Sequence, residues 1–187
     1  ASNRWNFEPD MLVCAKGMSS AYQPIAALLL TEKLFEPFKH GTNLFPHGYT
    51  YGGHPVAAAV ALENLNIFDE EDLIGNVQRN EDAFRKSLET LYDLPIVGDV
   101  RGVGYFWAIE LVKDRETKET FDDAESEKLL RGILSHRMFE EGLYCRSDDR
   151  GDPVVQLAPP LTIGPDQFDE ITTILRGCLE EASRAMK

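Results

Sequence analysis

The stretch from residue 11 to residue 30 constrains the fold most, because two short apolar runs flank a loop of small residues. Runs of this length, bounded by Gly, Ser and Pro, are typical of buried strands, although a buried helical segment has the same pattern. Lys16 directly follows the first run. Desolvation at the mouth of a buried strand would lower the pKa of this amine and free it as a nucleophile toward carbonyls. A surface lysine just past a strand end is the plainer alternative.

Composition and charge exclude several classes of protein. With 187 residues, 43% of them hydrophobic, the chain can bury a core and form one or two domains. A net charge of −13 without a basic stripe argues against a nucleic-acid partner. No apolar stretch has the length of a membrane span and no signal peptide is visible, so no membrane partner is expected. Three widely spaced cysteines, Cys14, Cys145 and Cys178, suit a reducing, cytoplasmic location. Because the first residue is Ala1 and not Met, we expect that an N-terminal portion is missing or removed.

The sequence predicts alternating helices and strands with one domain boundary near residue 69. Strands are expected at 11–15, 25–30, 96–100, 105–112, 143–146 and 154–157, and helices at 31–38, 54–68, 72–92, 122–141 and from 165 onward. The turn between the third and fourth strands is placed at 101–104, where Arg101 is expected to have a structural or domain-interface role. Residues 1–68 then form an α/β unit and residues 69–187 an α+β unit.

A glycine-rich segment, GYTYGG at 48–53, comes directly before a predicted helix start at His54. The free N–H groups and the dipole of a helix start attract phosphate, and the Thr50 hydroxyl adds a donor. A glycine-rich turn without a ligand is the alternative. His47 and His54 lie seven residues apart with no third ligand nearby, so no metal site is expected, and His54 is expected to cap the helix or pack. Tyr22, which follows the Lys16 loop, lines a substrate pocket or is a packed loop aromatic.

Arg146 is the candidate for binding a carboxylate. It ends a predicted strand ahead of an acidic loop, and a guanidinium holds a carboxylate through two parallel hydrogen bonds. Arg150 in the same loop is a rival. A surface ion pair of Arg146 with a neighbouring aspartate, namely Asp148, Asp149 or Asp152, is an equally open alternative.

Three long segments in order carry a resemblance to a known family. PDMLVCAKGMSSAYQPIAALLLTEKLFEPF, FPHGYTYGGHPVAAAVALENL and DVRGVGYFWAIELVKDRETKETF resemble blocks of the class III aminotransferases. These are pyridoxal-phosphate (PLP) enzymes of fold type I and include the ω-transaminases. The resemblance runs from about residue 7 to the C-terminus but covers only the second part of a family member. It implies an α/β fold, with residues 1–68 a remnant of the large PLP-binding domain and residues 69–187 the small C-terminal domain.

The resemblance also implies roles for individual residues. Lys16 matches the lysine that binds the PLP aldehyde as a Schiff base and then moves a proton between the substrate and the cofactor. Thr50 matches a threonine that reaches across a dimer interface to the cofactor phosphate of the other subunit, which implies a homodimer or larger assembly with shared active sites. Arg146 lies near the place where many members of the family have an arginine that grips the acceptor's carboxylate and swings away for apolar amines.

The implied reaction moves an amino group from an amine or ω-amino acid to a keto acid such as pyruvate or 2-oxoglutarate. Three elements of the family's cofactor site come earlier in its members and have no counterpart here: a Gly-Ser phosphate turn, a ring-stacking aromatic and an aspartate at the pyridine nitrogen. Two alternatives therefore stay open. One is another class III PLP enzyme, an isomerase or a decarboxylase, and the other is an inactive fragment that only mediates association.

Overall fold

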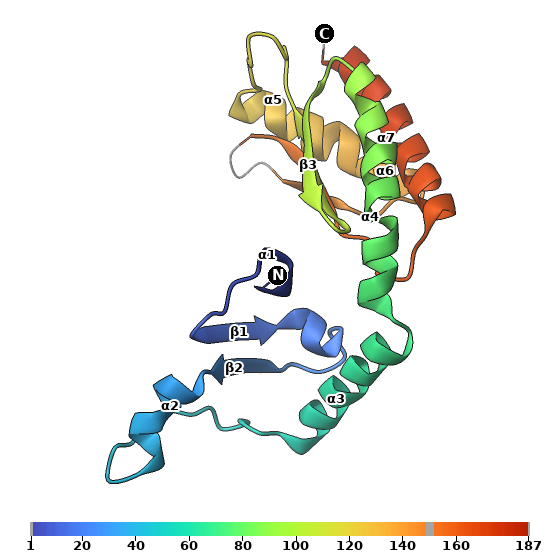
Figure 1. Ribbon diagram of the computed structural model, residues 1–187. Coiled ribbons are helices and arrows are strands. Elements are labelled where there is room, and N and C mark those ends of the chain that lie inside the picture. Colours follow the sequence, from blue (N-terminus) through green and yellow to red (C-terminus); the bar gives the residue numbers. More distant parts are fainter. Residues whose placement is uncertain (1, 149–151, 187) are drawn as a thin grey trace. The chain divides into compact units, whose positions relative to one another are not determined.

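A computed structural model describes residues 2–148 and 152–186, which form two compact units (Figure 1). The first unit comprises Ala1–Asp72 and the second Leu73–Lys187, so their boundary lies four residues beyond the position expected from the sequence. The first unit contains α1 (Ser2–Trp5), β1 (Met11–Ala15), η1 (Lys16–Ser19), β2 (Ala26–Leu30), α2 (Glu32–Lys39) and α3 (Pro55–Glu70).

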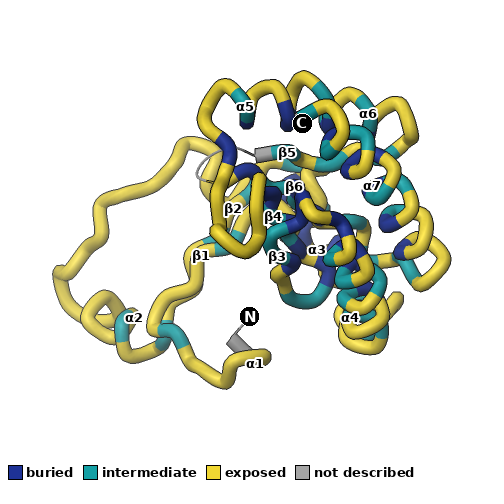
Figure 2. The backbone as a smooth tube through the Cα atoms, turned by 90° about the horizontal axis from the view of Figure 1, so that it is seen from above, coloured by how far each residue is buried: buried dark blue, intermediate teal, exposed yellow. Residues whose placement is uncertain are grey.

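Strands β1 and β2 form the antiparallel pair of the first unit, with Met11 opposite Leu30 and Ala15 opposite Ala26. Both predicted strands are therefore confirmed, but their expected burial is wrong for this chain. Most of their residues are exposed, including Val13, which is 75% exposed, and Figure 2 shows exposed residues along much of the first unit, including α2. The physical reason is that nothing described in this unit forms a second layer over either face of the pair, and two strands alone bury little.

Helix α3 packs through a different face from the one that its large apolar residues mark. Val56 and Leu65 are about half exposed, whereas Ala57, Ala61 and Asn64 are buried. These three positions recur at intervals of four and three and therefore lie on one face of the helix. That face contacts η1, the short 3₁₀ helix that begins at Lys16.

The second unit is built on a four-stranded antiparallel sheet in the order β3-β4-β6-β5. Its strands are β3 (Val97–Val103), β4 (Phe106–Leu111), β5 (Arg146–Asp148) and β6 (Val154–Leu157). Its helices are α4 (Leu73–Glu89), η2 (Thr90–Asp93), α5 (Asp123–Glu127), η3 (Lys128–Leu134), α6 (Ser135–Glu140) and α7 (Pro165–Ala185). The hydrophobic core lies between the sheet and these helices, and α4 packs along α7 (Figure 1).

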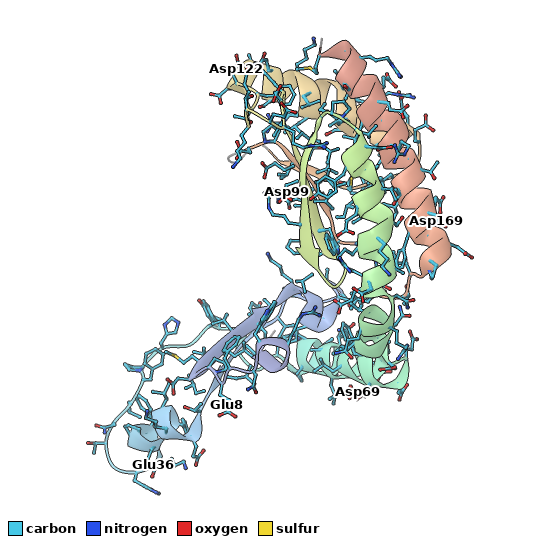
Figure 3. The ribbon with its side chains drawn as sticks, turned by 45° about the horizontal axis from the view of Figure 1, so that its top comes forward. Glu8, Glu36, Asp69, Asp99, Asp122 and Asp169 are labelled. Carbon is cyan, nitrogen blue, oxygen red and sulfur yellow. The ribbon has the colours of Figure 1, made fainter. Side chains whose placement is uncertain are left out.

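Local capping contacts mark both ends of the helical segment from α5 to α6. Asp122, labelled in Figure 3, accepts a hydrogen bond from the Glu125 N–H at 2.9 Å, and the Glu125 carboxylate accepts one from the Asp122 N–H at 2.9 Å. This reciprocal pair is the capping box, which satisfies two of the N–H groups that a helix start leaves unpaired. At the other end, Gly142 adopts φ +88°, the left-handed conformation expected just past a helix.

Three features of this unit differ clearly from the sequence prediction. The strand expected at 143–146 lies at Arg146–Asp148, so Arg146 begins this strand and does not end it, because pairing with β6 starts at Arg146. Strand β3 continues to Val103, so Arg101 lies within a strand and the reverse turn falls at Gly104 and Tyr105. The predicted helix from 122 to 141 contains a π-helical stretch, η3, which apolar periodicity does not reveal.

Candidate active site

Lys16 lies where strand β1 ends and η1 begins. Its side chain is exposed, so the buried amine expected from the sequence is not what this chain presents. Its backbone has φ +51°, and Ser20 and Ala21 at the other end of the loop have φ +46° and +63°. Each non-glycine residue in the left-handed region costs roughly 1–2 kcal/mol. Such a conformation persists only where the surrounding structure holds it.

The side chain of Asn64 on α3 holds the Lys16 loop. Its Nδ2 donates to the carbonyl oxygens of Gly17 at 3.0 Å and Met18 at 3.1 Å, and its Oδ1 accepts from the Ser20 hydroxyl at 2.7 Å. Asn64 is 7% exposed. Within the loop, the buried Ser19 hydroxyl donates to the Gln23 carbonyl at 2.6 Å. The backbone around Lys16 is therefore fixed by buried polar contacts while the lysine itself faces outward.

Thr50 lies in the turn that leads into α3, and its side chain is exposed. The Gly52 N–H donates to the Tyr49 carbonyl at 2.9 Å, and Gly53 adopts φ +71°. His54 is the N-cap, as expected, because its Nδ1 accepts from the Ala57 N–H at 3.3 Å. The Ala57 N–H is therefore already paired with His54 and is not available to a phosphate. The exposed hydroxyl of Thr50 can donate a hydrogen bond to a phosphate oxygen.

Tyr22 follows the Lys16 loop directly. Its N–H donates to the Ser19 carbonyl at 3.0 Å, which closes the turn, and its ring is 78% exposed. The ring is therefore not a packed loop aromatic within this chain. Lys16 and Tyr22 thus both lie in the connection between β1 and β2. Thr50 lies in the same unit, just before α3, the helix whose Asn64 anchors this connection.

Arg146 belongs to the second unit, where it begins β5 and pairs in register with Gln156. It lines a cavity of about 1130 Å³ in that unit. The cavity wall is mainly apolar and includes Phe106, Phe139, Leu143, Tyr144, Ile171 and Ile174. An arginine on an apolar wall suits a ligand with one carboxylate and an apolar body. Arg150 and Asp149 lie outside the described residues, as does the side chain of Asp148.

Arg101 lies between two acidic side chains on the sheet of the second unit. Its Nη1 is 3.1 Å from Asp99 Oδ2 and also contacts Glu110 Oε2. The hydrogen bond to Glu110 and then that to Asp99 raise the pKa of Arg101. These contacts support the structural role expected of Arg101.

Sequence reasoning missed Asn64 as a contributor to this site. A signal was available, because Asn64 shares a helix face with Ala57 and Ala61, and a buried amide needs hydrogen-bond partners. Its partners lie 44 to 47 residues earlier in the chain, however, so periodicity alone could not identify them.

Residues 2–148 and 152–186 contain no group of three or more His, Cys, Asp or Glu side chains placed to hold a metal ion. Over the same residues, no helix combines the length and the apolar character needed to cross a membrane.

Comparison with known proteins gives consistent matches. The sequence profile described as "Aminotransferase class-III" matches residues 1–179. The chain is 58% identical over 178 residues to a "Probable aminotransferase" of Mycobacterium tuberculosis, covering 95% of this chain and 38% of that protein. It is 40% identical over 179 residues to the putrescine–pyruvate aminotransferase of Pseudomonas aeruginosa, again covering 95% and 38%. The chain therefore spans about two fifths of the length of these curated relatives.

Solved structures agree with the sequence comparison. The PMP-bound aminotransferase of Vibrio fluvialis matches with a TM-score of 0.87 and 29% identity, covering all of this chain and 40% of that one. PMP is the PLP cofactor carrying an amino group.

Proposed function

This chain belongs to the class III aminotransferases, and we propose that it supplies the lysine-bearing part of an enzyme that moves amino groups from an amine or ω-amino acid to a keto acid. Class III aminotransferases use PLP as their cofactor. The observation that carries the proposal is that Lys16 is exposed on a loop whose backbone is held by hydrogen bonds from Asn64 to the Gly17 and Met18 carbonyls.

The residues present fit two contacts of the cofactor. When bound, PLP supplies an aldehyde that reacts with amines and a ring that withdraws electrons from the reacting carbon. Lys16 offers an exposed primary amine for covalent attachment to that aldehyde. Thr50 offers an exposed hydroxyl that donates to a phosphate oxygen.

Lys16 has two tasks in this proposal. Its amine would hold the cofactor covalently, and its Nζ, when free, would take up and return the proton of the substrate carbon. Both tasks need a side chain that swings while its backbone stays fixed. The exposed side chain and the anchored loop suit them.

Arg146 and Tyr22 are proposed to contact the substrates. Arg146 binds the carboxylate of the keto acid through its guanidinium. A relative 40% identical to this chain is named for putrescine, a diamine, and for pyruvate, which supports an amine donor and pyruvate as acceptor. The exposed ring of Tyr22, on the same loop as Lys16, lines the substrate side of the site.

Two further features belong to the proposal. Thr50 acts in the active site of a second copy, so that the enzyme is a homodimer or a larger assembly with shared sites. The protein is cytoplasmic, because Cys14, Cys145 and Cys178 are free thiols, as is usual in a reducing compartment.

Lys16→Ala in the whole protein tests the proposal. Borohydride reduction links PLP to the lysine that holds it, and peptide mass spectrometry then identifies that lysine. The Lys16→Ala variant should lose this label and all transfer from amine to keto acid. Lys33→Ala, which removes an exposed lysine of the same unit, should keep both. Label on another lysine, or full activity without Lys16, would contradict the proposal.

The same protein distinguishes the other chemistries of the family. A transaminase releases one aminated acceptor for each donor consumed, whereas an isomerase or a decarboxylase converts one substrate without any acceptor. Product analysis with putrescine and pyruvate, followed by a set of other keto acids, separates these cases.

A further inference from the structure

We propose that Asn64 is the positioning residue of the Lys16 loop, which it holds in the conformation that presents the lysine amine to PLP. This inference deepens the proposed function and rests on it.

The hydrogen bonds of Asn64 are matched to the loop. A primary amide offers two N–H donors and one carbonyl acceptor. Both donors are used, on the consecutive carbonyls of Gly17 and Met18, and the acceptor receives the Ser20 hydroxyl. The orientation of the amide follows from these partners, because only its nitrogen can donate to carbonyl oxygens. One buried side chain thus contacts three of the four residues that follow Lys16.

These contacts fix the part of the backbone that is strained. Lys16 at φ +51° and Ser20 at φ +46° mark the two ends of the segment that Asn64 holds. Without the amide, the Gly17 and Met18 carbonyls would lose these partners, and the loop would relax toward ordinary backbone conformations. The Lys16 amine would then occupy a range of positions instead of the one that suits reaction with the aldehyde, and its attachment to the cofactor would become slower.

Helix α3 is shaped to deliver this amide. Ala57 and Ala61 lie on the same face and carry only a methyl group, so the helix approaches η1 closely. The Asn64 side chain is the longest of the three, and it carries the polar atoms. A further hydrogen bond within the loop, from the Ser19 hydroxyl to the Gln23 carbonyl, does not involve Asn64.

The test uses the whole protein with PLP and compares two helix positions. Asn64→Ala removes all three contacts, and Asn64→Asp keeps the acceptor for Ser20 while removing both donors. The matched control is Asn66→Ala, because Asn66 is exposed on the same helix and its side chain donates to the exposed Glu63 carboxylate and not to the Lys16 loop. Apoprotein is mixed with PLP, and the absorbance of the lysine-bound cofactor gives the rate of uptake. Titrating this absorbance with pH gives the pKa of the lysine linkage.

Both Asn64 variants should take up PLP about 10 to 100 times more slowly, as expected for the loss of at least two hydrogen bonds to a buried side chain, and the pKa of the lysine linkage should shift. Asn66→Ala should match the wild type in both measurements. A merely structural role for Asn64 would lower the melting temperature and leave the uptake rate and the titration unchanged, and that result would overturn the inference.

Two further variants keep the result interpretable. If the Asn64 variants do not fold, Ser20→Ala decides, since it removes the hydroxyl that makes the third contact. Slower PLP uptake in Ser20→Ala than in Asn66→Ala supports the inference, and an uptake rate and a titration equal to those of Asn66→Ala overturn it. Lys16→Ala separates the two claims. If it still binds PLP covalently, the proposed function fails, whereas loss of binding in Lys16→Ala together with wild-type behaviour of Asn64→Asp defeats only the role of Asn64.

Discussion

The Nδ2 atom of Asn76 lies 2.7 Å from the carbonyl oxygen of Leu161, 85 residues further along the chain. The same nitrogen donates to the Ile163 carbonyl at 3.1 Å, and the Tyr105 hydroxyl donates to that carbonyl at 3.1 Å. Helix α4 is thereby tied to the loop before α7. Because Ile163 also lines the cavity that includes Arg146, these hydrogen bonds fix part of the cavity wall.

Asn76→Ala should destabilise the second unit by about 1–3 kcal/mol, because the Leu161 carbonyl loses its side-chain donor and the Ile163 carbonyl keeps only the Tyr105 hydroxyl. The free energy of unfolding is measured with urea on residues 73–187, which form a compact unit with their own core. Gln78→Ala is the control, since Gln78 is exposed on the same helix. Equal stability of the two variants would contradict the anchoring role of Asn76.

Asn76 and Asn64 show why part of this molecule could not be predicted. The apolar pattern of residues 72–92 predicted a helix there, because that pattern is local, and Phe84 and Leu88 of α4 and Leu91 of η2 are buried. The two asparagines act through carbonyls that are distant in sequence, so the local pattern around each asparagine does not identify its partners. Polar side chains that hold loops therefore appear only once the fold is known.

The strands at Lys16 show a second limit. Sequence predicted both strands and the loop between them, because short apolar runs and breakers are local features. Their burial was not predictable from these residues, because burial depends on what covers the pair, and nothing described in the first unit does so. Within the candidate site, Lys16, Thr50, Tyr22 and Arg146 came from a resemblance between motifs, and their functions stay predictions.

Gly102 and Gly177 should respond to alanine in opposite directions. A Cβ atom on Gly102 would meet the Phe106 carbonyl and lie 2.6 Å from Trp107 Cδ2, so one strand of the β3–β4 pair must shift. Gly102→Ala should cost about 1–3 kcal/mol of stability, as overpacking does. Gly177 lies exposed in α7 with nothing within 4 Å of its added Cβ, so alanine there should stabilise by about 0.5–1 kcal/mol. Urea unfolding of both variants measures the sign, and a loss of stability in each would refute the comparison.

The carboxylate of Asp99 should make the second unit sensitive to acid. Burial alone would raise the pKa of Asp99, but hydrogen bonds from Tyr92 and Arg101 outweigh it and hold this pKa below its ordinary value of 3.8. The ionised group therefore stabilises the fold above pH 3.8, and this stabilisation is lost as the pH falls through the lower folded-state value. The effect is modest because the side chain is 44% exposed.

Asp99→Asn should therefore lower stability at neutral pH and flatten its decline in acid. The free energy of unfolding, measured between pH 2 and pH 7 on residues 73–187, gives both quantities. Asp169→Asn is the control, because Asp169 is an exposed aspartate on α7 and both positions are labelled in Figure 3. An acid limb as steep in Asp99→Asn as in the control would exclude the stabilising role of Asp99.

Arg146→Ala tests the carboxylate site proposed for the whole enzyme. A guanidinium that binds a carboxylate through charged hydrogen bonds contributes about 1.5–3 kcal/mol, so kcat/KM for the keto acid should fall roughly 10- to 150-fold. The first half of the reaction with putrescine, which has no carboxylate, should be nearly unchanged, because this donor offers nothing for Arg146 to bind.

Single-turnover measurements separate these two halves, and Gln156→Ala is the comparison within the same cavity, since Gln156 lies opposite Arg146 in the sheet. Gln156→Ala should change both halves little, because an amide provides no charge for a carboxylate. Arg146→Lys should recover only part of the loss, as an ammonium group lacks the two parallel donors. An equal decrease for putrescine and for the keto acid would show that Arg146 maintains the cavity and does not select the carboxylate.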